Sequence, residues 1–320
     1  MATIMMPCAA GIARAVATLA AGDIAALPTE TVYGLAADAS NGLAVAKIYA
    51  AKGRPGFNPL ICHVSGLDMA RLYGVFDPLS ERLAKAFWPG PLTLVVPLRD
   101  GASIHPLVVA GLATIALRAP RGVVSEIITL LGRPIAAPSA NLSGRISLTN
   151  AHAVADELGL SVPLIIDGGP SPVGLESTIV KVDGGKVRLL RPGGVPAEEI
   201  ENVLGMALVR ASGGGVEAPG MLESHYAPNA KLRLNADRVL TGEALLAFGP
   251  RRAAGADKAS LVLNLSETGD LTEAAANLFS HLLALDKNGA AAIAAEPVPM
   301  RGLGEAVNDR LARAAAPRGQ

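Results

Sequence analysis

Two basic side chains, Lys52 and Arg54, stand two residues apart in the stretch "AKGRPGFNPLICHV". In an extended loop this spacing points both side chains to the same side. A planar guanidinium and a compact ammonium beside flexible glycines suit an anion such as a phosphate. The alternative is a solvated basic loop that binds nothing.

Neutral polar groups repeat this spacing in "RPIAAPSANLSG", where Ser139 and Asn141 follow an apolar strand and Ser143 continues the row. Hydroxyl and amide groups at such a strand end can donate to a ligand oxygen. Ordinary turn and capping chemistry uses the same residue types and remains the alternative.

Two arginines end strongly apolar strands, Arg118 in "TIALRAP" and Arg191 in "LLRPGG". Thr114 lies four residues before Arg118 and therefore on the same face of the strand. A buried arginine needs a partner. For Arg118 that partner is either a ligand carboxylate or phosphate, or one of the acids Glu30 and Glu176.

The stretch "PTETVYG" follows the apolar run 24–27 and places hydroxyls, a carboxylate and Gly34 where a strand should end. Turn chemistry accounts for Gly34. It does not account for Thr29, Glu30, Thr31 and Tyr33 together. Because several of the polar clusters terminate strands, where open α/β sheets bind ligands, we expect them to share one site.

The sequence offers no convincing nucleophile. His63 and His225 belong to no recognisable Ser-His-Asp arrangement, and neither Cys8 nor Cys62 has supporting neighbours. A site of Arg, Lys, Ser, Thr and Asn suits a reaction run by positioning and charge neutralisation, as in phosphoryl and nucleotidyl transfer. These residues predict an anionic, phosphate-bearing ligand.

Hydrophobic periodicity predicts a mixed α/β sheet over residues 1–208, a Gly/Pro-rich linker over 209–229 and a small α/β domain over 230–320. In the first domain we expect helices near 12–19, 43–51 and 79–87 and strands near 24–27 and 60–64. In the last domain we expect strands at 261–265 and 291–296 and helices at 271–285 and 304–315. Neither a G-x-G-x-x-G sequence nor a P-loop is present.

Composition narrows the class of protein. Of 320 residues, 50% are hydrophobic and 18% charged, and 28 Lys and Arg balance 28 Asp and Glu. A protein that mainly binds nucleic-acid phosphates normally has more Lys and Arg than Asp and Glu residues. The apolar stretch 104–117 is too short to span a membrane, and the amino terminus lacks the pattern of a secretory signal. We therefore expect a soluble cytoplasmic protein.

Eight motifs stand in order: "PTETVYGL", "KGRPGFNPLICHV", "WPGPLT", "LRAP", "PSANLSG", "ESTIV", "LRPG" and the linker "PGMLESHYAP". Together they resemble the YrdC-like family, in the long two-domain form of the threonylcarbamoyl-AMP synthases. The resemblance implies a YrdC-like twisted mixed sheet joined to a smaller Rossmann-like domain. It also implies synthesis of threonylcarbamoyl-AMP and pyrophosphate from L-threonine, bicarbonate and ATP, the first step of tRNA threonylcarbamoyladenosine modification.

The resemblance also implies roles for particular residues. Lys52 and Arg54 form the catalytic Lys-x-Arg pair, and Ser139 with Asn141 the Ser-x-Asn pair. The threonine pocket would consist of Thr31, His63, Arg118, Ser139 and Ser177. The nucleotide would contact Arg54, Asn58, Thr114, Asn141, Thr149, Arg191, His225 and Tyr226. The apolar residues Ile146 and Leu148, just before Thr149, depart from the pattern that the resemblance leads us to expect.

Magnesium is expected with ATP, without a dedicated protein site and without an organic cofactor. The expected partner is a downstream tRNA threonylcarbamoyl-transferase complex, with weak or transient tRNA binding. The linker, with His225 and Tyr226, is a candidate lid over a short-lived carbamate. Two rivals remain: a double-stranded RNA or tRNA-binding module, and a carbamoyl-transfer enzyme, which would need zinc-bearing regions.

Overall fold

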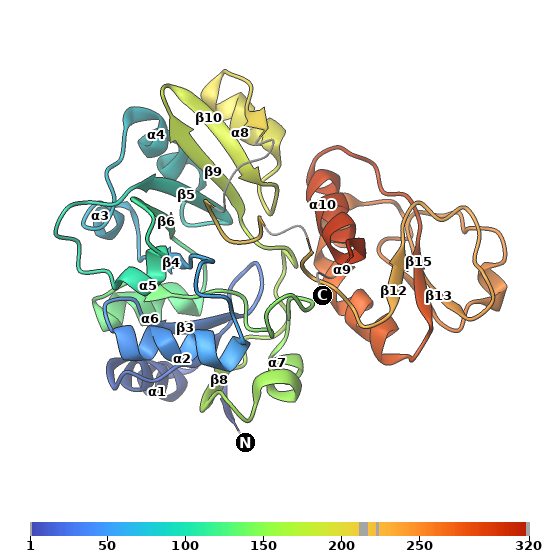
Figure 1. The fold of residues 1–320 in the computed structure, drawn as a ribbon, viewed down its shortest axis with the longest axis horizontal. Helices are drawn as coiled ribbons and strands as arrows, with labels where there is room; N and C mark the ends of the chain where they lie inside the picture. The colour runs from blue at the N-terminus through green and yellow to red at the C-terminus, as the bar shows by residue number, and fades with distance from the viewer. Residues whose placement is uncertain (1, 211–216, 222–223, 318–320) are drawn as a thin grey trace.

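The computed structural model describes residues 2–210, 217–221 and 224–317, which form two domains, each with its own sheet (Figure 1). Within these residues, the larger sheet has 11 strands in the order β1-β8-β2-β3-β7-β4-β6-β5-β9-β10-β11. Its strands are β1 (Thr3–Met5), β2 (Ala25–Leu27), β3 (Gly34–Asp38), β4 (Ile61–His63), β5 (Leu92–Pro97), β6 (Thr114–Arg118), β7 (Ile135–Ala136), β8 (Leu164–Ile166), β9 (Thr178–Asp183), β10 (Lys186–Arg191) and β11 (Val209–Arg210). Its helices are α1 (Ala9–Ala20), α2 (Gly42–Lys52), α3 (Leu67–Ala70), α4 (Pro78–Phe87), α5 (Pro106–Val109), α6 (Val123–Leu131), α7 (Ala151–Leu158) and α8 (Ala197–Leu204).

The large sheet is mixed, which confirms the predicted fold class. Strands β4 and β6 run parallel, as do β5 and β9, whereas β5 and β6 run antiparallel. Two of the antiparallel pairs are hairpins. In one of them, β9 and β10 are joined through Gly184 and Gly185, both at positive φ.

The polar stretch after β2 is the loop of a second hairpin. Strand β3 returns antiparallel to β2, with Leu27 opposite Gly34. The sequence pattern predicts the end of β2 and misses β3, because β3 is buried along its whole length and shows no alternation of polar and apolar residues. Residues 28–33 therefore turn back over the sheet between two buried strands.

The smaller domain carries a parallel sheet in the order β12-β15-β13-β14. Its elements are β12 (Lys231–Arg233), β13 (Glu243–Ala247), the 3₁₀ helix η1 (Ala256–Lys258), β14 (Val262–Asn264), α9 (Leu271–Lys287), β15 (Ala292–Ala295) and α10 (Leu303–Ala315). The predicted small α/β domain is confirmed. Strands β12 and β13 were not predicted, because β12 is short and polar and β13 begins with Glu243, which Arg233 neutralises within the fold.

Helices α9 and α10 lie on the side of the small sheet that faces the large domain (Figure 1). Three apolar side chains of the large domain, Val32, Ile146 and Leu175, belong to the same buried cluster as Phe279 and Leu282 of α9. Ile146 thus packs against the second domain. Strand β11 extends the large sheet two residues into the predicted linker; the domain boundaries themselves stay predictions.

Helix α2 carries Lys52 toward the site. Asn41 caps its first turn by accepting from the amides of Leu43 and Ala44. Gly53 ends it in the left-handed conformation, with φ 58°, so the chain turns sharply between Lys52 and Arg54.

Gly53→Ala should lower the free energy of unfolding by about 1 kcal/mol, because a Cβ disfavours the left-handed conformation. The added methyl would meet no atom within 4 Å, so the cost is conformational. Urea unfolding followed through the single tryptophan, Trp88, measures it. Gly56→Ala is the matched control, because that site is equally open but is not at positive φ. Equal stability of the two variants would contradict this reading.

Candidate active site

One cavity of about 50 Å³ brings most of the predicted site residues together. Its walls come from the β2–β3 loop, the end of α2, strands β4 and β6, the loop after β7, the ends of β9 and β10, and the linker. The predicted residues that line it are Thr31, Lys52, Arg54, His63, Arg118, Ser139, Asn141, Ser177, Arg191, His225 and Tyr226. The amino end of β9 and the carboxyl end of its antiparallel neighbour β10 meet at one edge of the sheet, which brings Ser177 and Arg191 together at the cavity.

Three predicted nucleotide residues do not line this cavity: Asn58, Thr114 and Thr149. Thr114 begins β6, at the opposite end of the strand from Arg118. Asn58 is buried, and neither polar atom of its side chain has a partner. The carbonyl of Thr149 accepts from the amide of Ser171 at 2.9 Å. Their nucleotide roles stay predictions.

Arg118 is buried at the end of β6 with partners on two sides. Its Nη1 donates to Thr31 Oγ1 at 2.9 Å, and Nε donates to the carbonyl of Gly90 at 3.2 Å. Nη2 lies 2.8 Å from Glu30 Oε2, but its N–H groups are not aimed at that oxygen and make no hydrogen bond. The guanidinium is therefore paired in charge with Glu30 while retaining N–H groups that can bind a carboxylate.

Lys52 is buried and holds the loop after β7. Its Nζ donates to the carbonyl of Ser139 at 2.6 Å and to that of Asn141. Burial, followed by repulsion from Arg54, holds the pKa of Lys52 well below its usual value. An anion in the cavity would offset both effects and favour the ammonium. Lys52 thus shapes the loop, and its catalytic role stays a prediction.

Arg54 and Arg191 carry positive charge to the wall of the cavity. Arg54 is partly exposed and donates to the carbonyls of Asn58 and Pro59. Burial lowers its pKa to about 10, which leaves it charged at neutral pH. Arg191 is buried and donates to Ser177 and to the carbonyl of Pro219. Both guanidiniums hydrogen-bond to neutral groups, which leaves their charge for an anion.

His63 at the end of β4 is neutral. Burial, with a smaller effect from Arg118, lowers its pKa to about 3. Its Nδ1 lies 3.3 Å from the carbonyl of Ile61, an oxygen that can only accept. Nδ1 therefore carries the proton, and Nε2 is left as an acceptor.

The described part of the linker covers the cavity. A Cβ on Gly220 would come within 2.9 Å of Arg191 Nη1 and 3.0 Å of the Tyr226 hydroxyl, so only glycine allows this approach. Tyr226 is buried at φ 62°, a strained conformation for an aromatic residue. Residues 211–216 and 222–223 of the predicted lid lie outside the described residues.

Several buried polar atoms of the lining residues have no partner: Asn141 Oδ1, His225 Nδ1 and the Tyr226 hydroxyl. Buried polar atoms in native proteins are nearly always satisfied. Unpartnered atoms gathered at one cavity therefore indicate a polar ligand.

The described residues contain no group of three or more His, Cys, Asp or Glu side chains that could hold a metal ion. Glu176 lines the cavity, but Ser147 and Arg310 each take one of its oxygens. Within the same residues, no helix has the length and apolar character needed to cross a bilayer.

The sequence pattern misses Arg310, which reaches Glu176 from α10. A signal was present: Arg310 lies at helical spacing among Val307, Leu311 and Ala314, within the buried face of α10. A charged residue in such a stripe indicates a buried partner.

Comparison with known proteins identifies the family. A family model described as "telomere recombination" and named for Sua5, YciO and YrdC matches residues 17–193. The chain belongs to this family. A second model, described as "threonylcarbamoyl-AMP synthase, C-terminal domain", matches residues 195–316.

Relatives of this Sua5/YciO/YrdC chain match nearly its full length. Threonylcarbamoyl-AMP synthases of Pyrococcus abyssi and Bacillus subtilis are each 40% identical to it, over 92% and 96% of the chain and 90% and 93% of the relatives. The crystal structure of P. abyssi Sua5 complexed with L-threonine superposes with a TM-score of 0.86 at 37% identity, covering 95% of this chain and 94% of that one.

The neutral state of His63 predicts acid sensitivity. Its pKa is about 3 in the folded chain and near 6.5 when unfolded, so below pH 6.5 the unfolded chain binds a proton that the folded chain refuses. The free energy of unfolding should therefore decrease as the pH is lowered below 6.5, by up to about 1.4 kcal/mol per pH unit for this residue. His63→Gln should reduce this slope in urea titrations from pH 7 to 4, whereas exposed His152→Gln should not. Identical slopes for His63→Gln and the wild type would contradict this account.

Proposed function

We propose that this protein synthesises threonylcarbamoyl-AMP from L-threonine, bicarbonate and ATP and releases pyrophosphate. The observation that carries the proposal is one cavity that joins the Arg118–Thr31 pair to the cationic wall of Arg54 and Arg191. The full-length similarity to threonylcarbamoyl-AMP synthases supports it.

The pocket around Arg118 suits L-threonine. The free N–H groups of Arg118 can bind the amino acid carboxylate in a bidentate pair. His63 offers Nε2 as an acceptor for a hydroxyl or amine hydrogen, and the hydroxyls of Ser139 and Ser177 complete a pocket for a small polar amino acid. The crystal structure of the P. abyssi relative in complex with L-threonine supports this assignment.

The reaction requires that the substrates be positioned and their charge neutralised, and it needs no intermediate bound covalently to the protein. The threonine amine attacks bicarbonate or carbon dioxide to give a carbamate, with loss of water in the first case and of a proton to solvent in the second. A carbamate oxygen then attacks the α-phosphorus of ATP in line, and pyrophosphate leaves. Arg54, Arg191 and Lys52 would neutralise the charge that builds on the α-phosphate and on the pyrophosphate.

Magnesium would enter with ATP, held by phosphate oxygens and water. The residues present fit that mode, because both oxygens of Glu176 are already taken. We also retain two predictions that rest on the resemblance: a downstream tRNA threonylcarbamoyl-transferase complex as partner, with weak or transient contact to tRNA, and a cytoplasmic location.

The cavity as it stands is small for this chemistry. Ligand sites usually enclose several hundred Å³, whereas this one holds about 50 Å³. ATP would therefore have to displace the covering residues, among them Gly220 and Tyr226, which would then close over the carbamate.

Pyrophosphate release tests the function directly. With purified full-length protein, Mg-ATP and bicarbonate, we expect release only when L-threonine is added, and none with valine or serine at the same concentration. Release that is independent of the amino acid, or salt-sensitive tRNA binding without any release, would overturn the proposal in favour of the RNA-binding rival.

In the same assay Arg54→Ala should reduce turnover roughly 10²-fold, the scale for a lost electrostatic group at a reacting oxyanion. Lys231→Ala, at an exposed site of the small domain, is the control. Lys52→Ala is a less clean test, because it also leaves the carbonyls of Ser139 and Asn141 unpaired.

Removing the aromatic cover should weaken ATP binding. Tyr226→Ala is expected to raise the KM for ATP about tenfold, the scale of one lost base–aromatic contact, while the KM for L-threonine changes less. Tyr226→Phe keeps the ring and removes the unpartnered hydroxyl, so it distinguishes their contributions to ATP binding. Wild-type kinetics for Tyr226→Ala would rule out the lid.

A further inference from the structure

Arg310 is a fully buried arginine through which the small domain reaches the wall of the cavity. Its Nε donates to Glu176 Oε2 at 2.8 Å, and its Nη2 donates to the carbonyl of Pro192 at 2.9 Å. Nη1 bonds Asp309 at 2.5 Å, and Cζ lies 5.0 Å from the centre of the Tyr226 ring. Each nitrogen of the guanidinium therefore has a partner, and the contacts join both domains and the linker.

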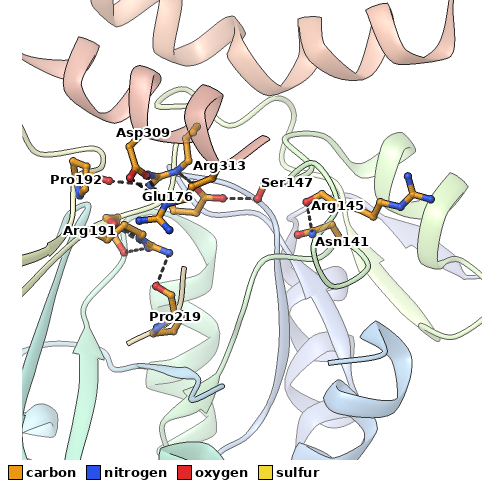
Figure 2. Close-up of polar contacts among 11 residues, drawn as sticks. Asn141, Arg145, Ser147, Glu176, Arg191, Pro192, Pro219, Asp309 and Arg313 are labelled. Atoms are coloured by element: carbon orange, nitrogen blue, oxygen red, sulfur yellow. Dashed lines mark hydrogen bonds and ion pairs between the residues drawn. The ribbon is translucent and has the colours of Figure 1, made fainter. Parts of the chain in front are cut away.

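Glu176 is held at both oxygens. Oε2 accepts from Arg310, and Oε1 accepts from the hydroxyl of Ser147. Figure 2 shows this carboxylate joined to Ser147 on one side and lying beneath α10 with Asp309 on the other. The direction of Glu176 is thus set by one contact from each domain.

Arg191 lies close to Glu176 but is bonded elsewhere. It donates to Ser177 and to the carbonyl of Pro219, and Figure 2 shows it directed to Pro219. Burial alone would raise the pKa of Glu176, but attraction to Arg310 and Arg191, together with hydrogen bonds from Ser147 and Arg310, lowers it overall. Glu176 is therefore an anion within electrostatic range of Arg191, and in this arrangement it makes no ion pair with it.

Removing Arg310 would leave Glu176 as a buried anion without its closest cation. A buried charge that loses its partner seeks another. Arg191 is a buried cation on the same cavity wall. Pairing with Glu176 would turn the Arg191 guanidinium from its present contacts with Ser177 and Pro219 and cancel the charge it offers to the cavity.

We propose that Arg310 is a positioning residue for nucleotide binding: by holding Glu176, it keeps the charge of Arg191 free for the phosphates of ATP. The inference rests on the proposed function, because it takes the anion to be ATP. It gives the small domain a defined role, since docking of α10 and binding of ATP then favour each other.

A purely structural role of Arg310 in joining the two domains predicts a different result. If Arg310 only joined the domains, its removal would lower stability and affect ATP and L-threonine alike. If Arg310 is a positioning residue, its removal weakens the binding of ATP specifically, and the effect requires the charge of Glu176. The two roles can therefore be separated by measuring both ligands and by neutralising Glu176.

The experiment is calorimetric titration of the full-length chain with Mg-ATP and, separately, with L-threonine. Arg310→Met should weaken ATP binding at least tenfold and change L-threonine binding less than threefold. Arg301→Met is the matched control, because that arginine is exposed, lies just before α10 and should leave both affinities unchanged. Equal loss for both ligands, or no loss for ATP, would overturn the proposal.

Neutralising Glu176 gives the decisive comparison. In a Glu176→Gln background, Arg310→Met should no longer affect ATP affinity, because no anion remains to compete for Arg191. This double variant also buries no unpaired carboxylate, so it tests the idea even if Arg310→Met alone does not fold. A double variant that binds ATP tenfold more weakly than Glu176→Gln would contradict the proposal.

These titrations are distinct from the test of function. A wild-type chain that binds ATP but releases no pyrophosphate with L-threonine would refute the synthase assignment and leave the coupling of Arg310, Glu176 and Arg191 open to the same measurement. A chain that releases pyrophosphate but shows no such coupling would refute only the positioning role.

Discussion

The site depends on buried positive charge that the protein leaves partly unneutralised. Among the described residues that line the cavity, Lys52, Arg54, Arg118 and Arg191 are cationic groups, and Glu176 is the acid. Burying such charges is costly unless they find partners. The fold directs Glu176 to the small domain and Glu30 to Arg118, so the remaining positive charge needs an anionic ligand. The phosphates of the proposed ATP and the carboxylate of the proposed threonine would meet that need.

This constraint gives the small domain a part in the site, although none of its described residues lines the cavity. The apolar contact of Ile146 and Leu175 with α9 holds the small domain against the large one, and Arg310 enters beside that contact. The Arg310 guanidinium is fully buried, and Glu176 and Asp309 neutralise its charge there. Packing and electrostatics therefore act at the same interface.

The sequence predicts which residues belong to the site better than it predicts how far each one lies from the cavity. Strand-end residues such as Arg118 and Arg191 were predicted because a charge after an apolar run must find a partner. Thr114 was grouped with Arg118 because both share a strand face, but four residues of strand separate them by about 13 Å. The alternation of residues along a strand predicts which face of the sheet a side chain lies on. How far that side chain lies from a cavity depends on the tertiary structure.

The fold shows the same division. The mixed sheet, helix α2 and the small α/β domain follow from periodicity and breakers, whereas β3 does not, because a fully buried strand lacks an alternating pattern. The partner of Lys52 was also beyond the sequence: two backbone carbonyls, of Ser139 and Asn141, take its ammonium. Backbone acceptors carry no sequence signature, so which ones a lysine meets is decided by the loop's path.

The most direct measurement is a crystal structure of the full chain with L-threonine and a non-hydrolysable ATP analogue. The account predicts that the threonine carboxylate lies within hydrogen-bond distance of the Arg118 guanidinium, with the phosphates against Arg54 and Arg191 in the same cavity. Threonine and nucleotide bound at separate surfaces, or phosphates facing away from both arginines, would contradict it.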